Sequence, residues 1–455
     1  MKKILLTALT VATLFSASAE GYQVNTLSAK QLGMGHVGVA QKLNSESLWY
    51  NPAGAAFQEQ KLTMSASFTG IMATSTWTEA NDYSGSPLAT HESDNSLSTP
   101  MSFNINYKVT DNLSFGVLFN TPYGSSMNWG DSWAGSHLVQ SINLSAYNAQ
   151  PTIAYKFLDG KLSVGVGLMM TWGTFELSRS LMDIDSNSDI ASLLEYYQMS
   201  DAAAAVTAVG DNPLASATLS GDASLKLGYN IGIMYDFHKN WTLGLSYRSK
   251  IDMDVDAGEA ELNYANSGIQ TILTTLDAIP AINTGTFSAS LPLPATLSAG
   301  LSYRPTERWE LATEIQWVQW SAYDVLSVKF NDPSLDGYSI DADKNYSDTI
   351  MARFGAQYVT TDWLTTRVGL YVDQSPVASD YLNPETPSMT KVGYTCGASI
   401  MPFSSKNFSL DLAYCYVSSA DPERMGSYPV EDSSPFVGNY TTKAHVFSVG
   451  LSYGF

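Results

Sequence analysis

The stretch Phe447-Ser448-Val449-Gly450-Leu451-Ser452-Tyr453-Gly454-Phe455 places a large apolar residue at every second position, with Ser or Gly between them. A period of two sends successive side chains to opposite faces of a β-strand. One face of this strand is therefore apolar throughout, and the other is small and polar. The same pattern returns at 225–237, 241–248 and 364–373. Alternating strands are thus the repeated unit of the chain.

Fourteen such segments can be counted along the chain, and several exceed the roughly 10 residues that a tilted strand needs to cross a bilayer. Their approximate first residues are Leu62, Met101, Leu113, Leu138, Leu162, Ala223, Trp241, Phe287, Trp309, Thr349, Leu364, Met389, Phe408 and Thr442. Short turns, such as Asp159-Gly160 and Lys239-Asn240, alternate with long polar segments. These long segments lie at about 79–99, 122–137, 182–221, 257–286, 331–346, 375–387 and 419–440.

Short turns at one end and long loops at the other are typical of outer-membrane barrels. We therefore predict an all-β membrane β-barrel of 14 antiparallel strands, integral to a bacterial outer membrane of the Gram-negative type, with both termini on the periplasmic side. A closed barrel leaves no backbone amide unpaired in lipid. A secreted β-sandwich would also show alternation, but it requires neither the alternation of connection lengths nor a terminal aromatic strand.

Charge and the first residues add two constraints. The 455 residues carry 23 basic and 43 acidic side chains, a formal charge of −20, which argues against a nucleic-acid partner. Lys2 and Lys3 precede an apolar run at 4–15 and the small residues Ala17-Ser18-Ala19, which is the pattern of a secretory signal. We predict a signal peptide over 1–19. Its apolar run is too short for a membrane-spanning helix.

Residues 20–58 do not alternate. They are rich in glycine and contain possible short helices at 28–32 and 45–49. A compact segment ahead of a barrel either hangs in the periplasm or folds into the lumen as a plug. The remaining residues, 59–455, would then form the barrel.

Three stretches of this segment resemble the N-terminal hatch of the FadL/TodX-type outer-membrane transporters: Gly21-Tyr22-Gln23-Val24-Asn25, Gly33-Met34-Gly35-His36-Val37-Gly38 and Tyr50-Asn51-Pro52-Ala53-Gly54. Phe119-Asn120-Thr121-Pro122-Tyr123-Gly124 is similar to the end of that family's third strand. Those proteins carry long-chain fatty acids or aromatic hydrocarbons. The resemblance implies a 14-stranded barrel with a hatch over 20–58 in its lumen, and Asn51, Pro52 and Ala53 as the hatch motif. It also implies substrate capture by extracellular loops and a kinked third strand that opens the wall sideways.

Two loops carry apolar residues at helical spacing, over about 186–210 and 267–280. Ser267 is a candidate N-cap of the second, and Pro280 would end it. These helices either capture an apolar substrate or pack on each other and cap the barrel, and the two roles can coexist. The candidate capture residues are Leu193, Leu194, Tyr197, Ile269, Ile272, Leu273 and Leu276.

Pro122 and Gly124 are candidates for a disturbed strand, since Pro cannot donate to the ladder and Gly tolerates unusual backbone angles. The alternative is an ordinary transition from strand to loop. A fatty-acid carboxylate would need a cation. The candidates are Arg179, Arg248, Arg353 and Arg367. The alternative for each is pairing with lumen acids or with the hatch.

Together these features predict passive outer-membrane transport of hydrophobic molecules. Long-chain fatty acids are favoured, aromatic hydrocarbons or other lipids remain open, and a general porin or solute channel is the alternative function. No cofactor, metal or catalytic site is expected, because the five histidines form no metal motif and no Gly-x-Ser-x-Gly elbow occurs. The expected partners are a hydrophobic small molecule, outer-membrane lipid and lipopolysaccharide, and the protein is expected to be a monomer and not an enzyme.

Overall fold

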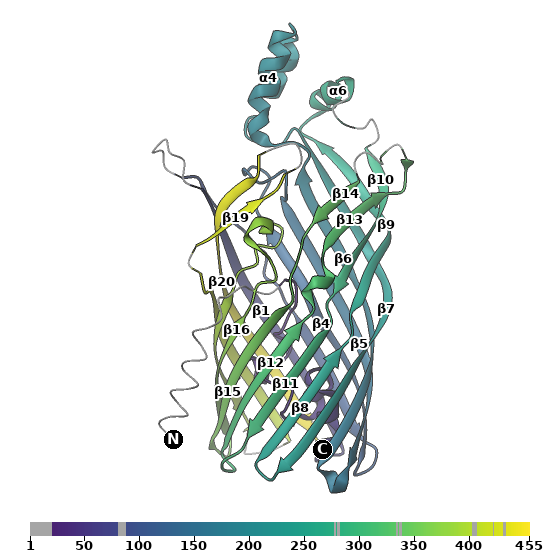
Figure 1. Ribbon diagram of the computed structural model, residues 1–455, viewed down its shortest axis with the longest axis vertical. Coiled ribbons are helices and arrows are strands. Elements are labelled where there is room, and N and C mark those ends of the chain that lie inside the picture. Colours follow the sequence, from purple (N-terminus) through teal and green to yellow (C-terminus); the bar gives the residue numbers. More distant parts are fainter. Residues whose placement is uncertain are drawn as a thin grey trace.

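The strands close into an antiparallel β-barrel whose long axis is vertical in Figure 1. This computed structural model describes residues 21–455 except 81–87, 277–278, 280–282, 334, 336–338, 403–406, 422 and 431–433. The signal peptide predicted for 1–19 therefore lies outside the described residues. None of the described helices is long and apolar enough to cross a membrane.

Within the described part of the chain, the wall consists of fourteen strands in chain order, which confirms the predicted barrel. Ten are continuous: β1 (Leu62–Glu79), β3 (Met101–Lys108), β4 (Leu113–Asn128), β5 (Ser141–Phe157), β6 (Leu162–Ser180), β7 (Ala215–His238), β16 (Leu364–Asp373), β17 (Lys391–Ile400), β18 (Phe408–Ser419) and β20 (Phe436–Gly454). Four are each interrupted once: β8 (Trp241–Arg248) with β9 (Ile251–Tyr264), β11 (Thr296–Tyr303) with β10 (Thr284–Leu293), β12 (Trp309–Val318) with β13 (Val325–Phe330), and β15 (Thr349–Thr361) with β14 (Ile340–Asp343).

The ring closes between the first and last strands, where β1 pairs β20 without interruption from Thr63↔Gly454 to Glu79↔Gly438. Two short strands, β2 (Thr90–Glu92) and β19 (Arg424–Tyr428), add to the long-loop ends of β1 and β20. Within the described residues each wall strand pairs a neighbour on both sides over at least part of its length, so the sheet forms a closed ring.

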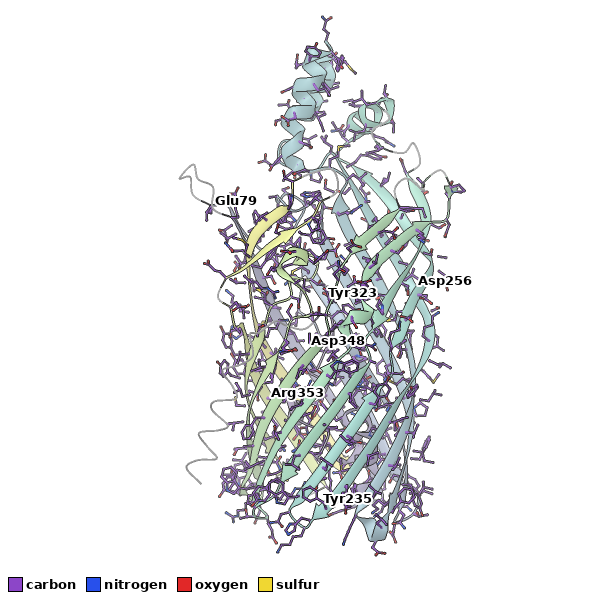
Figure 2. The ribbon with its side chains drawn as sticks, in the orientation of Figure 1. Glu79, Tyr235, Asp256, Tyr323, Asp348 and Arg353 are labelled. Atoms are coloured by element: carbon purple, nitrogen blue, oxygen red, sulfur yellow. The ribbon has the colours of Figure 1, made fainter. Side chains whose placement is uncertain are left out.

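The apolar face of each strand points outward in the lower wall. On β7, for example, the residues at odd positions from Leu225 to Phe237 are exposed, whereas Asn230, Gly232 and Met234 between them are buried. Tyr235 lies at the short-turn end of the barrel (Figure 2). An apolar outer belt over a small, polar inner face is what a lipid-spanning barrel requires.

Several strands run farther than predicted. β4 continues to Asn128, β7 begins at Ala215 and β9 continues to Tyr264, all within segments expected to be loops. The reason is visible on β7, where the pairing with β6 shifts register between Thr171 and Gly173. Beyond this bulge Asp222 is exposed and Leu219 is buried. The outer face is polar here, so the alternation of apolar and polar residues stops while the strand itself continues.

The N-terminal segment lies inside the lower half of the barrel, where Figure 1 shows it in purple. Its short helices are α2 (Ala29–Leu32), η1 (Asn44–Glu46), α3 (Ser47–Tyr50) and η2 (Pro52–Phe57). Ser28 caps α2 by accepting a hydrogen bond from the Gln31 amide. Most of residues 21–58 are buried, so this segment fills the lumen and is called the hatch below.

Three helices stand above the wall: α4 (Asn187–Tyr196), α5 (Ser200–Thr207) and α6 (Ser267–Thr275). Figure 1 shows α4 and α6 at the long-loop end. The first predicted helix is therefore divided in two, and Gln198, with φ +61°, lies at the break. The N-cap of α6 is Asn266 rather than Ser267, because the Asn266 side chain accepts from the Ile269 amide. Pro280 lies outside the described residues.

Candidate functional site

Asn51 joins the hatch to itself and to the wall. Its Oδ1 accepts from the Ala53 amide at 3.1 Å and so caps η2. Its Nδ2 donates to the Val39 carbonyl at 2.7 Å and to the Ile233 carbonyl of β7 at 3.0 Å. Pro52 at the first helical position suits its fixed φ. The Asn-Pro-Ala motif therefore acts as a bracket that fixes the end of the hatch against β7.

Two glycines on the inner wall make room for this bracket. A Cβ added at Gly232 would lie 2.0 Å from Asn51 Oδ1, and one at Gly165 would lie 2.5 Å from the Ala53 amide nitrogen. Both separations are far below contact distance, so no larger residue fits at either position without moving the hatch.

Glu314 of β12 binds the middle of the hatch from a strand three positions along the wall from β7. Its Oε2 accepts from the Gly38 and Val39 amides at 2.8 and 2.9 Å, and its Oε1 pairs with Arg353 Nη1 at 2.6 Å. Arg353 also donates to Asn25 Oδ1 at 3.1 Å. Arg353, labelled in Figure 2, is thus occupied in holding the hatch.

Next to this pair the hatch buries His36. Burial lowers the pKa of His36 to about 3, and the positive charge of Arg353 acts in the same direction. The His36 ring meets Tyr371 edge-on, with 5.0 Å between the centroids. A neutral imidazole is therefore part of the docked hatch.

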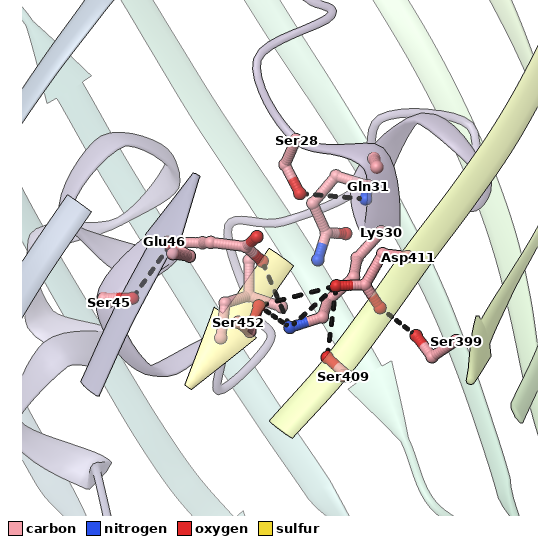
Figure 3. A network of polar contacts seen from close by, with 12 residues as sticks. Ser28, Lys30, Gln31, Ser45, Glu46, Ser399, Ser409, Asp411 and Ser452 are labelled. Atoms are coloured by element: carbon pink, nitrogen blue, oxygen red, sulfur yellow. Dashed lines mark hydrogen bonds and ion pairs between the residues drawn. The ribbon is translucent and has the colours of Figure 1, made fainter. Parts of the chain in front are cut away.

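A charged network anchors α2 near the short-turn end (Figure 3). Lys30 Nζ lies 3.6 Å from Asp411 Oδ2 and 3.9 Å from Glu46 Oε2, and it donates to Ser452 Oγ at 2.7 Å. Burial raises the pKa of Glu46, and the nearby Lys30 opposes this shift. This network ties two hatch residues to β18 and β20.

Arg367 and Arg248 have different surroundings. Arg367 donates to Gln357 Oε1 at 2.7 Å and to Ser399 Oγ at 2.6 Å, and Ser399 in turn binds Asp411. Arg248 lies over the Trp49 ring at 4.1 Å and donates to Thr296, but its buried Nη1 has no hydrogen-bond partner among the described residues. Arg248 thus retains a free donor, whereas Arg367 is committed to the wall.

The predicted strand kink is a β-bulge. The pairing of β4 with β5 shifts register between Asn120 and Tyr123, a segment that contains Pro122. The start of the hatch binds here: the Val24 amide donates to the Pro122 carbonyl at 2.8 Å, and the Gly124 amide donates to the Tyr22 carbonyl at 2.9 Å. Hatch residues therefore satisfy backbone groups that the irregular strand leaves without ladder partners.

Beside the bulge the wall between β3 and β4 is incomplete. β3 begins at Met101, whereas β4 continues past Asn120 to Asn128. A cavity of about 470 Å³ lies there, lined by hatch residues 21 and 23–26 and by Leu97, Tyr123, Gly124 and Tyr147. Gly124 lines it without a side chain to fill it. The cavity links the start of the hatch to the irregular part of the wall.

Arg179 lies in the upper part of the barrel, at the end of β6. It lines a cavity of about 910 Å³ together with Leu177, Leu219, Leu262 and Phe330. No hydrogen bond or ion pair joins Arg179 to any described residue, in contrast to Arg353 and Arg367. This volume is typical of a ligand site, and a cation with free donors in it suits a carboxylate.

A smaller apolar pocket of about 40 Å³ continues below, and it shares Leu177 with the upper cavity. Leu144, Phe175, Met253 and Val255 line it, and Tyr22 of the hatch lies at its edge. The Tyr22 hydroxyl donates to the Pro292 carbonyl, and its ring packs edge-on against Trp320. Tyr22 therefore forms the part of the pocket wall that the hatch contributes.

The candidate capture residues on the loop helices fall into a buried group and an exposed group. Leu194, Ile269 and Leu273 are buried in a cluster with Val206 and Leu214, and Ile272 packs at its edge. Leu193, Tyr197 and Leu276 are exposed, Tyr197 to 65%. The first group holds the helices together, and the second is exposed on the helices at the long-loop end.

Tyr22, Glu314 and Lys30 were not predicted as site residues. Tyr22 lies within the stretch 21–25 that resembles a hatch, and Glu314 lies on the strand predicted to begin at Trp309. No signal in the sequence marks Lys30 as the partner of Asp411, because 381 positions separate the two residues.

Comparison with known proteins places these features in a family context. A family model described as "Outer membrane protein transport protein (OMPP1/FadL/TodX)" matches residues 9–455. The chain is 23% identical over 354 residues to the long-chain fatty acid transport protein of Escherichia coli (strain K12), covering 76% of this chain and 75% of the relative. It superposes on a Pseudomonas aeruginosa FadL homologue with a TM-score of 0.76 at 20% identity, covering 96% and 100% of the two chains. For the P. putida toluene transporter TodX the TM-score is 0.67 at 18% identity, covering 96% and 99%.

Proposed function

The chain belongs to the OMPP1/FadL/TodX family of outer membrane transport proteins, and from this premise we propose that its substrate is a long-chain fatty acid. As a member of this family it is an integral outer-membrane β-barrel for hydrophobic molecules. The observation that carries the choice of substrate is Arg179, which has no ion-pair partner among the described residues and lies in a large cavity whose lining is mainly apolar and also includes Asp183, Asp341 and Asp343. A carboxylate can form an ion pair with this cation, and a hydrocarbon cannot.

Capture begins on the exposed apolar residues of the loop helices, Leu193, Tyr197 and Leu276. Each methylene removed from water contributes about 0.8 kcal/mol, so a long chain is favoured over a short one. The acid then enters the upper cavity, where its carboxylate binds Arg179 and its chain contacts Leu177 and Leu219.

Release proceeds through the incomplete wall between β3 and β4. The hatch residues Tyr22 and Val24 leave the β4 bulge, which frees the cavity beside Tyr123 and Gly124. The acyl chain passes from the apolar pocket into lipid, and the hatch bracket at Asn51, Pro52 and Ala53 keeps the lower hatch in place. The protein acts as a monomer among outer-membrane lipid and lipopolysaccharide, since the ring closes within one chain.

The test is the binding of radiolabelled palmitate, its methyl ester and toluene to the purified barrel in mild detergent. For Arg179→Gln we expect about a 10- to 100-fold weaker affinity for palmitate, because a hydrogen bond to a charged group contributes about 1.5–3 kcal/mol. The methyl ester should bind both proteins equally. Arg308→Gln, in an exposed turn at the opposite end, is the matched control and should change nothing.

Equal weakening of acid and ester would contradict the role of Arg179. A barrel that binds toluene but neither palmitate nor its ester would assign it to aromatic hydrocarbons. A barrel that binds none of the three and conducts ions freely would favour the porin function.

A further inference from the structure

The wall has a second seam without ladder pairing, between β7 and β9. Below it β7 pairs β8 up to Asn230↔Arg248, and above it β7 pairs β9 from Ser220↔Glu259. Between these points, all within the described residues, no register joins 221–228 to 250–258. β7 remains paired with β6 on its other side, and β9 with β10. The break is therefore confined to this single seam.

Side chains close the seam in place of ladder hydrogen bonds. On the outer side Lys226 pairs with Asp254, which also accepts from Ser290 Oγ at 2.6 Å. Ser224 Oγ donates to the Asp254 carbonyl at 3.3 Å. On the inner side Val255 packs against Gly221, where an added Cβ would lie 2.6 Å from Val255 Cγ1. Figure 2 labels Asp256 of β9, which locates this seam on the barrel.

The β3–β4 seam and the β7–β9 seam lie on either side of one group of four wall strands, β4 to β7. Tyr123 of β4 pairs Ala146, Ala146 pairs Gly173, and Gly173 pairs Ala223 of β7. The bulge of β4 and the bulge between β6 and β7 thus lie on one row of residues across four strands. The β3–β4 seam lies at one end of this row, and the β7–β9 seam lies at the other. Figure 1 shows β7 and β9 along the right-hand side of the barrel.

The seam separates an apolar pocket from an outer face that carries both apolar and charged side chains. Ala223, Met253, Val255 and Ser290 line the pocket below the Arg179 cavity. Outside, Leu225 and Leu227 are 54% and 64% exposed, among the most exposed apolar side chains of the wall. On β9 the outward-facing residues here are Asp252, Asp254 and Asp256, so Val255, Met253 and the Lys226–Asp254 ion pair separate the pocket from the outer surface.

We propose that the β7–β9 seam is a second lateral port, through which an acyl chain passes between the apolar pocket and the outer leaflet. This inference rests on the proposed transport of fatty acids. Opening it displaces side chains and one partly exposed ion pair, whereas opening a paired seam would break a row of backbone hydrogen bonds in lipid, where no water replaces them.

The test closes the seam with a disulfide between Gly221→Cys and Val255→Cys, in a background of Cys396→Ser and Cys415→Ser. The short distance from a Cβ at Gly221 to Val255 suits a disulfide. Uptake of radiolabelled oleate into vesicles is compared before and after reduction. The matched control is Thr174→Cys with Asp222→Cys, a directly paired position across the intact β6–β7 seam.

We expect the oxidised Gly221→Cys/Val255→Cys protein to take up oleate at least twofold more slowly, with full recovery on reduction, and the control to be insensitive to oxidation. Equal uptake in both redox states would overturn the second port. A background protein that takes up no oleate at all would instead refute the proposed function.

A measurement without ligand tests the second port independently of the proposed transport of fatty acids. Amide hydrogen exchange should be faster on average over 221–228 than over 230–235, where β7 is paired on both sides. Equally slow exchange in the two segments would overturn the port whatever the substrate.

Discussion

Replacing Asn51 by Ala tests the bracket that holds the hatch. The variant loses the cap of η2, which is worth about 1 kcal/mol. It also leaves the Val39 and Ile233 carbonyls without the Nδ2 donor, and each such loss in a buried site costs about 1–3 kcal/mol. The sum is about 3–7 kcal/mol, which lowers the equilibrium constant for hatch docking by roughly 10²- to 10⁵-fold.

The assay is amide hydrogen exchange over residues 38–58, beside single-channel conductance in a planar bilayer. We expect faster exchange at Ala53 and Gly54 and more frequent ion-conducting openings, with an unchanged melting temperature of the barrel strands. Asn112→Ala, in an exposed turn, is the matched control and should behave as the unmodified protein. Unchanged protection and conductance in Asn51→Ala would refute the bracket.

Three further changes test the rest of the hatch contacts, by the same exchange assay. His36 is neutral when docked because its pKa is lowered to about 3, so docking is strongest above pH 6.5 and should weaken by up to about 1.4 kcal/mol per unit as pH falls from 6.5 toward 3. His36→Gln should remove this dependence, and an identical pH profile in the variant would contradict it. Gly232→Ala should displace the hatch at a cost of about 1–3 kcal/mol, because the added Cβ would lie 2.0 Å from Asn51 Oδ1. Unchanged exchange protection of the Ala53 amide in this variant would contradict that displacement. Lys30→Met should weaken docking by about 2 kcal/mol by leaving Asp411 without its cation, and Lys30→Met/Asp411→Asn should restore part of the loss.

Strand parity predicted the lower wall because one face of each strand meets lipid there. Arg248, Arg353 and Arg367, three of the predicted candidates for a carboxylate-binding cation, are buried. Strand parity could not predict which of these arginines lacks an ion-pair partner. Arg353 is neutralised by Glu314, on the neighbouring strand but 39 positions away in sequence, and only the strand pairing brings the two together.

The upper wall escaped prediction for a different reason. Above the bulge at Gly173 the outer face is polar, and Asp222 and Ser220 replace the apolar residues. Nothing in the local sequence distinguishes such a strand from a polar loop. The cavity around Arg179 depends on these extended strands, so its lining could not be listed from the sequence, although Arg179 itself was a candidate.

The long register between β1 and β20 also constrains how the protein is made. Its partners lie about 380 positions apart, the slowest kind of contact to form because a long loop must close first. The hatch precedes β1 and fits glycines on distant strands with no spare room. We therefore expect closure of the ring to be a late step of biogenesis, with the nascent barrel built around the hatch.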